Sequence, residues 1–270
     1  MNAITSRLVL DTILAASLTG MTCGLMGVFI TQMNLSSLGF CMSHAAFAGA
    51  ALGLLFSINP LPLAMAFSIL IAAILGPVAE KARLHANVVM GILFPLTMAL
   101  GLIFLNLSPG FAMTSSALSL LWGSVLGISR DDIRKLILLA GVMNMLVVAF
   151  EKEFRAIMLD RKLAKASGIK TEPFYYLILF LTGVTVALSL RLVGGLLIFT
   201  LMTNPASTAY QLFYDIKKIL IFSPLLGAIF SLFGILLSFC YNLPIGSSIA
   251  IVSTLTFLIA AGLSPKRRVG

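Results

Sequence analysis

The chain has 270 residues, of which 60% are apolar and only 27 are charged, 18 basic and 9 acidic. A soluble domain carries about 25% charged residues, and a disordered chain needs low hydrophobicity and high charge. The composition therefore excludes both classes and indicates a membrane protein without room for a soluble catalytic domain. The net charge of +9 reports membrane topology, since nucleic-acid binding needs a basic face on a soluble module.

Nine apolar segments follow one another, each of a length that suits a spanning helix of about 20 residues. They are Leu8–Thr31, Ser36–Ser57, Pro60–Ala79, Val88–Leu107, Ile133–Phe150, Phe174–Leu190, Leu192–Leu212, Ile219–Tyr241 and Pro244–Gly262. A further segment, Ser115–Leu126, is too short to span and is expected to form a re-entrant or surface helix. We therefore expect one all-α polytopic domain over residues 1–270, with about eight to nine transmembrane helices.

The charges lie between these segments, and ten of the 27 lie in residues 151–172. The positive-inside rule places this loop and the basic tail at residues 266–268 in the cytoplasm, and the four segments between them agree in parity. Within the loop, Asp160 is expected to cap a short amphipathic helix that ends before Gly168. Leu163 and Ala164 are among its apolar positions, and the pattern alone is typical of a helix on the membrane surface.

The second segment carries Ala45, Gly49 and Gly53 at intervals of four residues. Such residues share one helix face and let another backbone approach closely. Gly20 and Gly24, and Gly123 and Gly127, repeat this spacing. The pattern predicts helix packing and says nothing about a substrate.

His44 lies well inside the second segment, next to Ser43. Ionisable groups at membrane depth usually face the protein interior or an aqueous path, and neutral imidazole is a common transition-metal ligand. Two interpretations stay open, a buried hydrogen-bonded histidine and a tentative metal ligand that lines a transport pathway.

The seventh segment contains Pro205, preceded by Thr203 and Asn204. Proline removes a backbone donor, and broken helices often line transporter pathways. We therefore expect a helix break over residues 202–208, with Thr203 and Asn204 as pathway candidates or as part of a structural kink. Gly194 and Gly195 indicate a second weak point.

Five motifs, in order, resemble those of the permeases of bacterial ATP-binding-cassette metal importers, the zinc/manganese/iron uptake family. The similarity extends over nearly the whole chain. The motifs are Ser43-His44-Ala45, Gly91–Phe94 followed by Ala99–Gly101, Leu120–Leu126, Asp160–Gly168 in a D-x-x-x-A-x-x-x-G pattern, and Val193-Gly194 through Pro205-Ala206.

The resemblance implies a multi-pass permease in the bacterial cytoplasmic (inner) membrane that imports a divalent metal ion, zinc or manganese, without a covalently bound cofactor. Its implied partners are a second permease chain (identical or a related paralogue), cassette ATPase subunits, an extracytoplasmic metal-binding protein and membrane lipid, with no nucleic acid. ATP belongs to the ATPase subunits, since this chain has no Walker-type phosphate loop, and we do not expect it to be an enzyme. The residues implied in ATPase coupling are Asp160, Arg161, Leu163, Ala164, Lys165 and Gly168.

One position departs from the family pattern. The family commonly has an aspartate four residues before the histidine, where Asp and His would share a helix face. Here that residue is Phe40. A non-identical second permease could supply the missing carboxylate. The alternatives are a permease of the same type for a metal chelate or vitamin, and an ion-gradient-driven secondary transporter, which would usually need acidic residues within its spans.

Overall fold

The computed structural model describes residues 3–108, 129–195, 198–264 and 266, and within these ranges the regular structure is helical throughout. The helices are α1 (Ala3–Gln32), α2 (Leu38–Leu55), α3 (Pro60–Ala82), α4 (Ala86–Leu107), α6 (Arg130–Ala149), α7 (Glu151–Leu159), α8 (Arg161–Ala166), α9 (Thr171–Val193), α10 (Ile198–Leu212), α11 (Ile216–Tyr241) and α12 (Ile245–Leu263). The expected all-α polytopic fold is confirmed. The predicted short helix at Ser115–Leu126 and the Gly123/Gly127 pair lie outside the described residues.

Seven of the described helices are long and apolar enough to cross a membrane, or eight if the bent pair α6 and α7 forms one span. Two of the nine predicted segments account for the difference. The segment Ile133–Phe150 corresponds to α6, which meets the span criterion only together with α7. The segment Leu192–Leu212 yields α10, whose 15 residues reach about 22 Å, less than the hydrocarbon thickness of about 30 Å.

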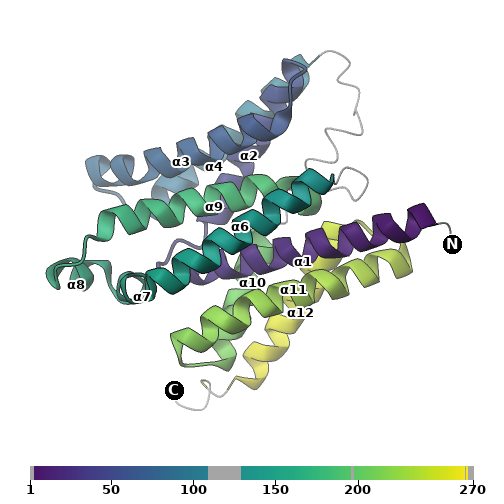
Figure 1. Ribbon diagram of the computed structural model, residues 1–270. Helices are drawn as coiled ribbons and strands as arrows, with labels where there is room; N and C mark the ends of the chain where they lie inside the picture. Colours follow the sequence, from purple (N-terminus) through teal and green to yellow (C-terminus); the bar gives the residue numbers. More distant parts are fainter. Residues whose placement is uncertain (1–2, 109–128, 196–197, 265, 267–270) are drawn as a thin grey trace.

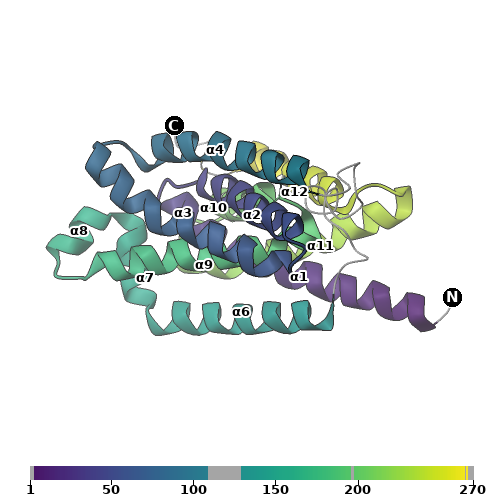
Figure 2. The same ribbon diagram turned by 90° about the horizontal axis from the view of Figure 1, so that it is seen from above.

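The long helices run roughly parallel in two groups (Figure 1). The group of α2, α3, α4 and α9 packs beside the group of α1, α11 and α12, with α10 between them. The short helices α7 and α8 lie at one end of the bundle, and the N-terminus lies at the other. Seen from above, α6 lies on the side of α9 away from α4 (Figure 2).

Helix α2 lies in the interior and contacts α3, α4, α9 and α10. Its small residues permit this close approach. A Cβ atom on Gly49 would lie 2.2 Å from the carbonyl oxygen of Leu63, and one on Gly53 would lie 2.7 Å from Cα of Pro60. Gly101 of α4 makes room for the Phe47 ring in the same way. Because the small residues let neighbours enclose α2, His44 is held in the centre of the fold.

The predicted break at residues 202–208 is wrong, because α10 continues through Pro205. A proline within a membrane helix removes one backbone bond, and neighbouring helices and hydroxyl side chains can compensate for it. The α10 helix packs against α1, α11 and α12. The chain instead breaks after α9, where Gly194 has a φ of +83°, at the second weak point that the sequence indicated.

Candidate functional site

Aromatic side chains enclose His44 in the middle of α2. The residue is 2% exposed, and its ring centroid lies 4.8 Å from that of Phe40 and 4.7 Å from that of Phe94 on α4. Phe40 also contacts Phe94 at 4.5 Å and Phe199 of α10 at 5.7 Å. Neither imidazole nitrogen has a hydrogen-bond partner among the described residues. An unused nitrogen ligand therefore lies where α2, α4 and α10 meet.

The surroundings of His44 offer few other ligands. Ser43 is fully buried, and its hydroxyl donates to the carbonyl oxygen of Phe40 at 2.8 Å. Within the described ranges, no group of three or more His, Cys, Asp or Glu side chains could hold a metal ion. A stable transition-metal site uses three or four ligands. His44 therefore does not belong to a resident metal centre among the described residues.

A polar stripe lies on one face of α10, the helix that also carries Phe199. Its residues occur at i, i+3, i+4, i+7 and i+11, which places them on one side of the helix. They are Thr200, Thr203, Asn204, Ser207 and Gln211, all half-buried. Partly exposed polar groups at membrane depth usually face an aqueous path or another protein chain.

Hydrogen bonds hold two residues of this stripe in place. Thr203 donates to the carbonyl oxygen of Phe199, so its hydroxyl lies next to the aromatic cluster. The Asn204 amide donates to the hydroxyls of Ser253 and Thr254 on α12, both at 3.0 Å. The stripe is therefore a fixed surface that links α10 to α12.

At one end of the bundle, α7 lies across the helix ends. The chain bends by 81° between α6 and α7, and the ring of Phe154 packs 5.1 Å from Phe29 of α1 and 5.6 Å from Phe174 of α9. Glu151 pairs with Lys217, at the start of α11, at 3.2 Å. Helix α7 therefore connects α1, α9 and α11.

Helix α8 follows directly and is closed at both ends. The Asp160 carboxylate accepts from the backbone N–H groups of Lys162 and Leu163 at 2.6 and 3.0 Å. At the other end, the N–H groups of Gly168 and Ile169 bond back to Lys165 and Ala164, and Gly168 has a φ of +87°, which together form a Schellman motif. The short capped helix predicted from the sequence is confirmed.

Leu163 and Ala164 of α8 differ sharply in burial. Ala164 is 4% exposed and packs inward, whereas Leu163 is 68% exposed. The Arg161 guanidinium lies 4.2 Å from the ring centroid of Tyr175 on α9. Helix α8 thus presents a leucine with flanking positive charges on a body that is attached to α9.

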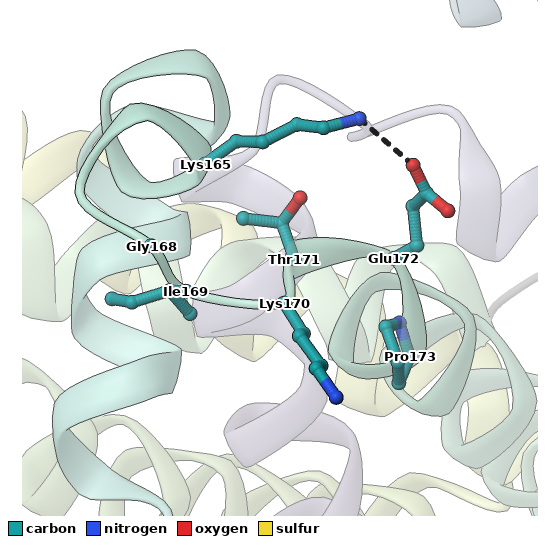
Figure 3. Close-up of a pocket in the computed structure, with 7 residues that line it drawn as sticks. All are labelled: Lys165, Gly168, Ile169, Lys170, Thr171, Glu172 and Pro173. Atoms are coloured by element: carbon teal, nitrogen blue, oxygen red, sulfur yellow. Dashed lines mark hydrogen bonds and ion pairs between the residues drawn. The ribbon is translucent and has the colours of Figure 1, made fainter.

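Figure 3 shows the turn that joins α8 to α9. Lys165 reaches back over Thr171 and forms an ion pair with Glu172 at 3.0 Å, at the start of α9. The chain between Gly168 and Lys170 closes the turn. This short connection, together with Arg161 on Tyr175, makes α8 and the first turn of α9 a coupled unit.

The structure places the predicted residues in three regions. His44 and Ser43 lie on α2, Thr203 and Asn204 lie on α10 with Asn204 bonded to α12, and residues 160–168 lie at the end of the bundle. Phe94 and Phe199 connect the first region and were missed, because one phenylalanine among 19 carries no signal. Thr200 and Ser207 were also missed, although their helical spacing with Thr203 and Asn204 is visible in the sequence.

A sequence profile of the ABC 3 transport family matches residues 5–264, nearly the whole chain. The chain belongs to the ABC 3 transport family. The permease identity that the sequence motifs indicated is thereby confirmed, as is a multi-pass location in the cytoplasmic membrane. An ion-gradient-driven secondary transporter is no longer supported.

Relatives and a solved structure resemble the chain over most of its length. The "manganese transport system membrane protein MntC" of Listeria monocytogenes is 33% identical over 250 residues, covering 92% of this chain and 88% of that protein. The "manganese import system permease protein ScaB" of Streptococcus gordonii is 28% identical, covering 96% and 92%. The structure described as PsaBC from Streptococcus pneumoniae in complex with Fab aligns with a TM-score of 0.85 and 27% identity, covering 97% of this chain and 93% of that one.

Proposed function

We propose that this chain is one of two permease subunits of an ATP-driven manganese importer. The second subunit is another copy or a related permease, cassette ATPase subunits bind on the cytoplasmic side, and an extracytoplasmic binding protein delivers the metal. The choice of manganese as the substrate is supported by the similarity, over most of both chains, to permeases named for manganese transport and import. These relatives favour manganese over zinc.

In this proposal the pathway follows the region where α2, α4 and α10 meet. His44 supplies the nitrogen ligand, and Thr203 and Asn204 belong to a polar stripe that provides oxygen atoms for a partly hydrated ion. Manganese prefers oxygen ligands but also accepts imidazole. The Ser43 hydroxyl is bonded to the backbone of its own helix. Ser43 therefore acts on the pathway only indirectly, by helping to position α2.

The ATPase contact is assigned to α8. Leu163 fits an apolar pocket in a partner, and Arg161 and Lys165 surround it with positive charge. Asp160 and Gly168 hold the helix in shape, and Ala164 attaches it to the permease. Because α8 and α9 move as a unit, a displacement of α8 is transmitted along α9 to Gly194 and from there to α10 and Phe199, a change of the hinge type.

Uptake in proteoliposomes tests the proposal. The permease is reconstituted with its ATPase and binding protein, and uptake of radioactive manganese is measured with ATP or a non-hydrolysable analogue. We expect uptake only with ATP, and a loss of about tenfold or more in His44→Ala, the range seen when a metal-binding group is removed. His85→Ala is the matched control, because His85 is the other histidine and is exposed in the turn before α4. Equal uptake in both variants would contradict a role for His44.

A second candidate is a permease for a metal chelate, and the aromatic cluster favours it. Phe40 stands where a carboxylate would complete a ligand pair with His44, and the rings of Phe40 and Phe94 pack against the imidazole, with Phe199 behind Phe40. A chelated metal brings its own ligands, accepts one nitrogen and packs its organic part against aromatic faces.

The two candidates differ in what competes for uptake. Adding an excess of a weak organic chelator to the assay lowers the concentration of free manganese. If the substrate is the bare ion, uptake falls in proportion to free metal. If it is the chelate, uptake rises with the chelator and Phe40→Leu weakens it.

A further inference from the structure

A groove of about 510 Å³ lies on the outside of the bundle between α3, α6 and α9. The wall formed by α6 contains Lys135, Leu138 and Val142, which share one helix face because they are three and four residues apart. Phe180 and Leu188 of α9 form the opposite wall. These two residues are eight positions apart, so the groove runs about 12 Å along the helices.

The lining is apolar except at the end nearest the starts of α3 and α6. There, the Asn59 side chain is occupied, since it accepts from the backbone N–H of Leu61 at 3.1 Å. Lys135 is exposed, and its ammonium group forms no ion pair or hydrogen bond among the described residues. The neighbouring Asp131 pairs with Arg134 at 3.0 Å. Within the described ranges, Lys135 is therefore a positive charge without an ion-pair partner at the mouth of an apolar groove.

The position of this charge suits a lipid headgroup. Helix α6 begins at the end of the bundle opposite α7 and α8 (Figure 1), and Lys135 lies about 8 Å from its start. Lysine side chains near the ends of membrane helices extend to the interface and keep the ammonium group with the headgroups. The apolar residues deeper in the groove then lie at acyl-chain depth.

We infer that this groove binds one anionic phospholipid, with its phosphate at Lys135 and an acyl chain between α6 and α9. The charge complementarity selects an anionic headgroup, because a lysine near the membrane surface attracts anionic lipid. The site is separate from the α2–α10 region and from α8. It accounts for how α6, set apart on the far side of α9 from α4 (Figure 2), is supported along its open side.

The same molecule contains a control groove. A groove of about 590 Å³ between α11 and α12 is lined by apolar residues such as Phe233 and Val252, together with Thr256 and Tyr241, and no charged side chain lines it. Lipid can fill both grooves, but only the groove at Lys135 offers a cation. If the groove at Lys135 prefers an anionic headgroup and the groove between α11 and α12 does not, the difference measures the contribution of the Lys135 charge.

Tryptophan quenching in vesicles tests the inference. Trp122, the single tryptophan, is replaced by phenylalanine, and a reporter is placed by Phe180→Trp in the proposed site or by Phe233→Trp in the control groove. Both reporters exchange one aromatic residue for another at partly exposed positions. Each protein is reconstituted in phosphatidylcholine vesicles that contain brominated phosphatidylglycerol or brominated phosphatidylcholine as the quencher.

We expect the Phe180→Trp reporter to show about a fivefold relative preference for phosphatidylglycerol, the ratio typical of one lysine near an anionic headgroup. The Phe233→Trp reporter should show a ratio near one. Lys135→Ala should abolish the preference, and Lys135→Arg should keep it.

Three outcomes would overturn the inference. The first is equal quenching by both lipids at Phe180→Trp, which means that the groove holds any lipid. The second is a preference that survives Lys135→Ala. The third is the absence of quenching by either lipid, which means that a protein chain covers the groove.

Discussion

The surroundings of His44 and the 151–172 loop are built in opposite ways. His44 is buried among phenyl rings with no hydrogen-bond partner in the described structure, and glycine contacts hold its helix. Helix α8 is six residues long, exposed and charged, and caps and ion pairs hold it. The difference indicates that function in α2 depends on packing, whereas function in α8 depends on what the surface presents to a partner.

The largest effect should come from packing at α2. Gly49→Ala places a Cβ atom 2.2 Å from the Leu63 carbonyl oxygen, so α2 and α3 must move apart. We expect a loss of about 1–3 kcal/mol in the free energy of unfolding, the usual range for overpacking, measured by thermal unfolding in detergent. Gly91→Ala is the control, since nothing lies within 4 Å of its Cβ position, and it should be neutral or stabilising. Equal destabilisation of both variants would contradict the packing interpretation.

Surface chemistry, in contrast, should govern α8. Leu163→Asp changes a residue that is 68% exposed, so the stability of the permease should not change. Loss of a central apolar contact typically lowers partner affinity by about tenfold or more, which co-purification of the ATPase and ATP-driven uptake would detect. Leu84→Asp, in the turn between α3 and α4 and 43% exposed, is the matched control. Normal ATPase binding by Leu163→Asp would exclude α8 as the contact.

The two regions also differ in how well the sequence predicts them. The capped helix at Asp160–Gly168 depends on local chemistry, a carboxylate before the helix and a glycine after it, and both ends are as predicted. The aromatic cluster at His44 depends on Phe94, which contacts the imidazole, and on Phe199, which contacts Phe40, and both are distant in sequence and carry no periodic signal. The expected break at Pro205 failed because packing against neighbouring helices outweighs one lost backbone bond, whereas the positive φ of Gly194 was accessible to sequence reasoning.

A carboxylate at position 40 should turn the packed site into a ligand site. Phe40→Asp places an oxygen ligand one helical turn before His44, on the same helix face. We expect manganese affinity of the isolated permease to rise by about tenfold or more, because a second ligand is added, with a loss of stability in the metal-free protein, since an unpaired buried charge is costly. Calorimetric titration measures the first effect and thermal unfolding the second.

Phe40→Asn serves as the control for this variant, because the amide has a similar size and no charge. It should bind manganese more weakly than Phe40→Asp. Metal binding that is equal in Phe40→Asn and Phe40→Asp would show that the opening of the aromatic cluster, and not the carboxylate, creates the site.

The smallest effect should be that of the Lys165–Glu172 ion pair, which joins α8 to α9 at the surface. Both side chains are more than 60% exposed, and exposed pairs contribute about 0.2–1 kcal/mol. A double-mutant cycle of Lys165→Met and Glu172→Gln, read by amide hydrogen exchange at Gly168 and Ile169, isolates the pair from the other roles of each residue. The coupling energy should fall as salt is raised, because exposed charges are screened. A coupling energy above about 2 kcal/mol that does not change with salt would be typical of a buried ion pair. Helix α8 would then be held as rigidly as α2, which would contradict the contrast between the two regions.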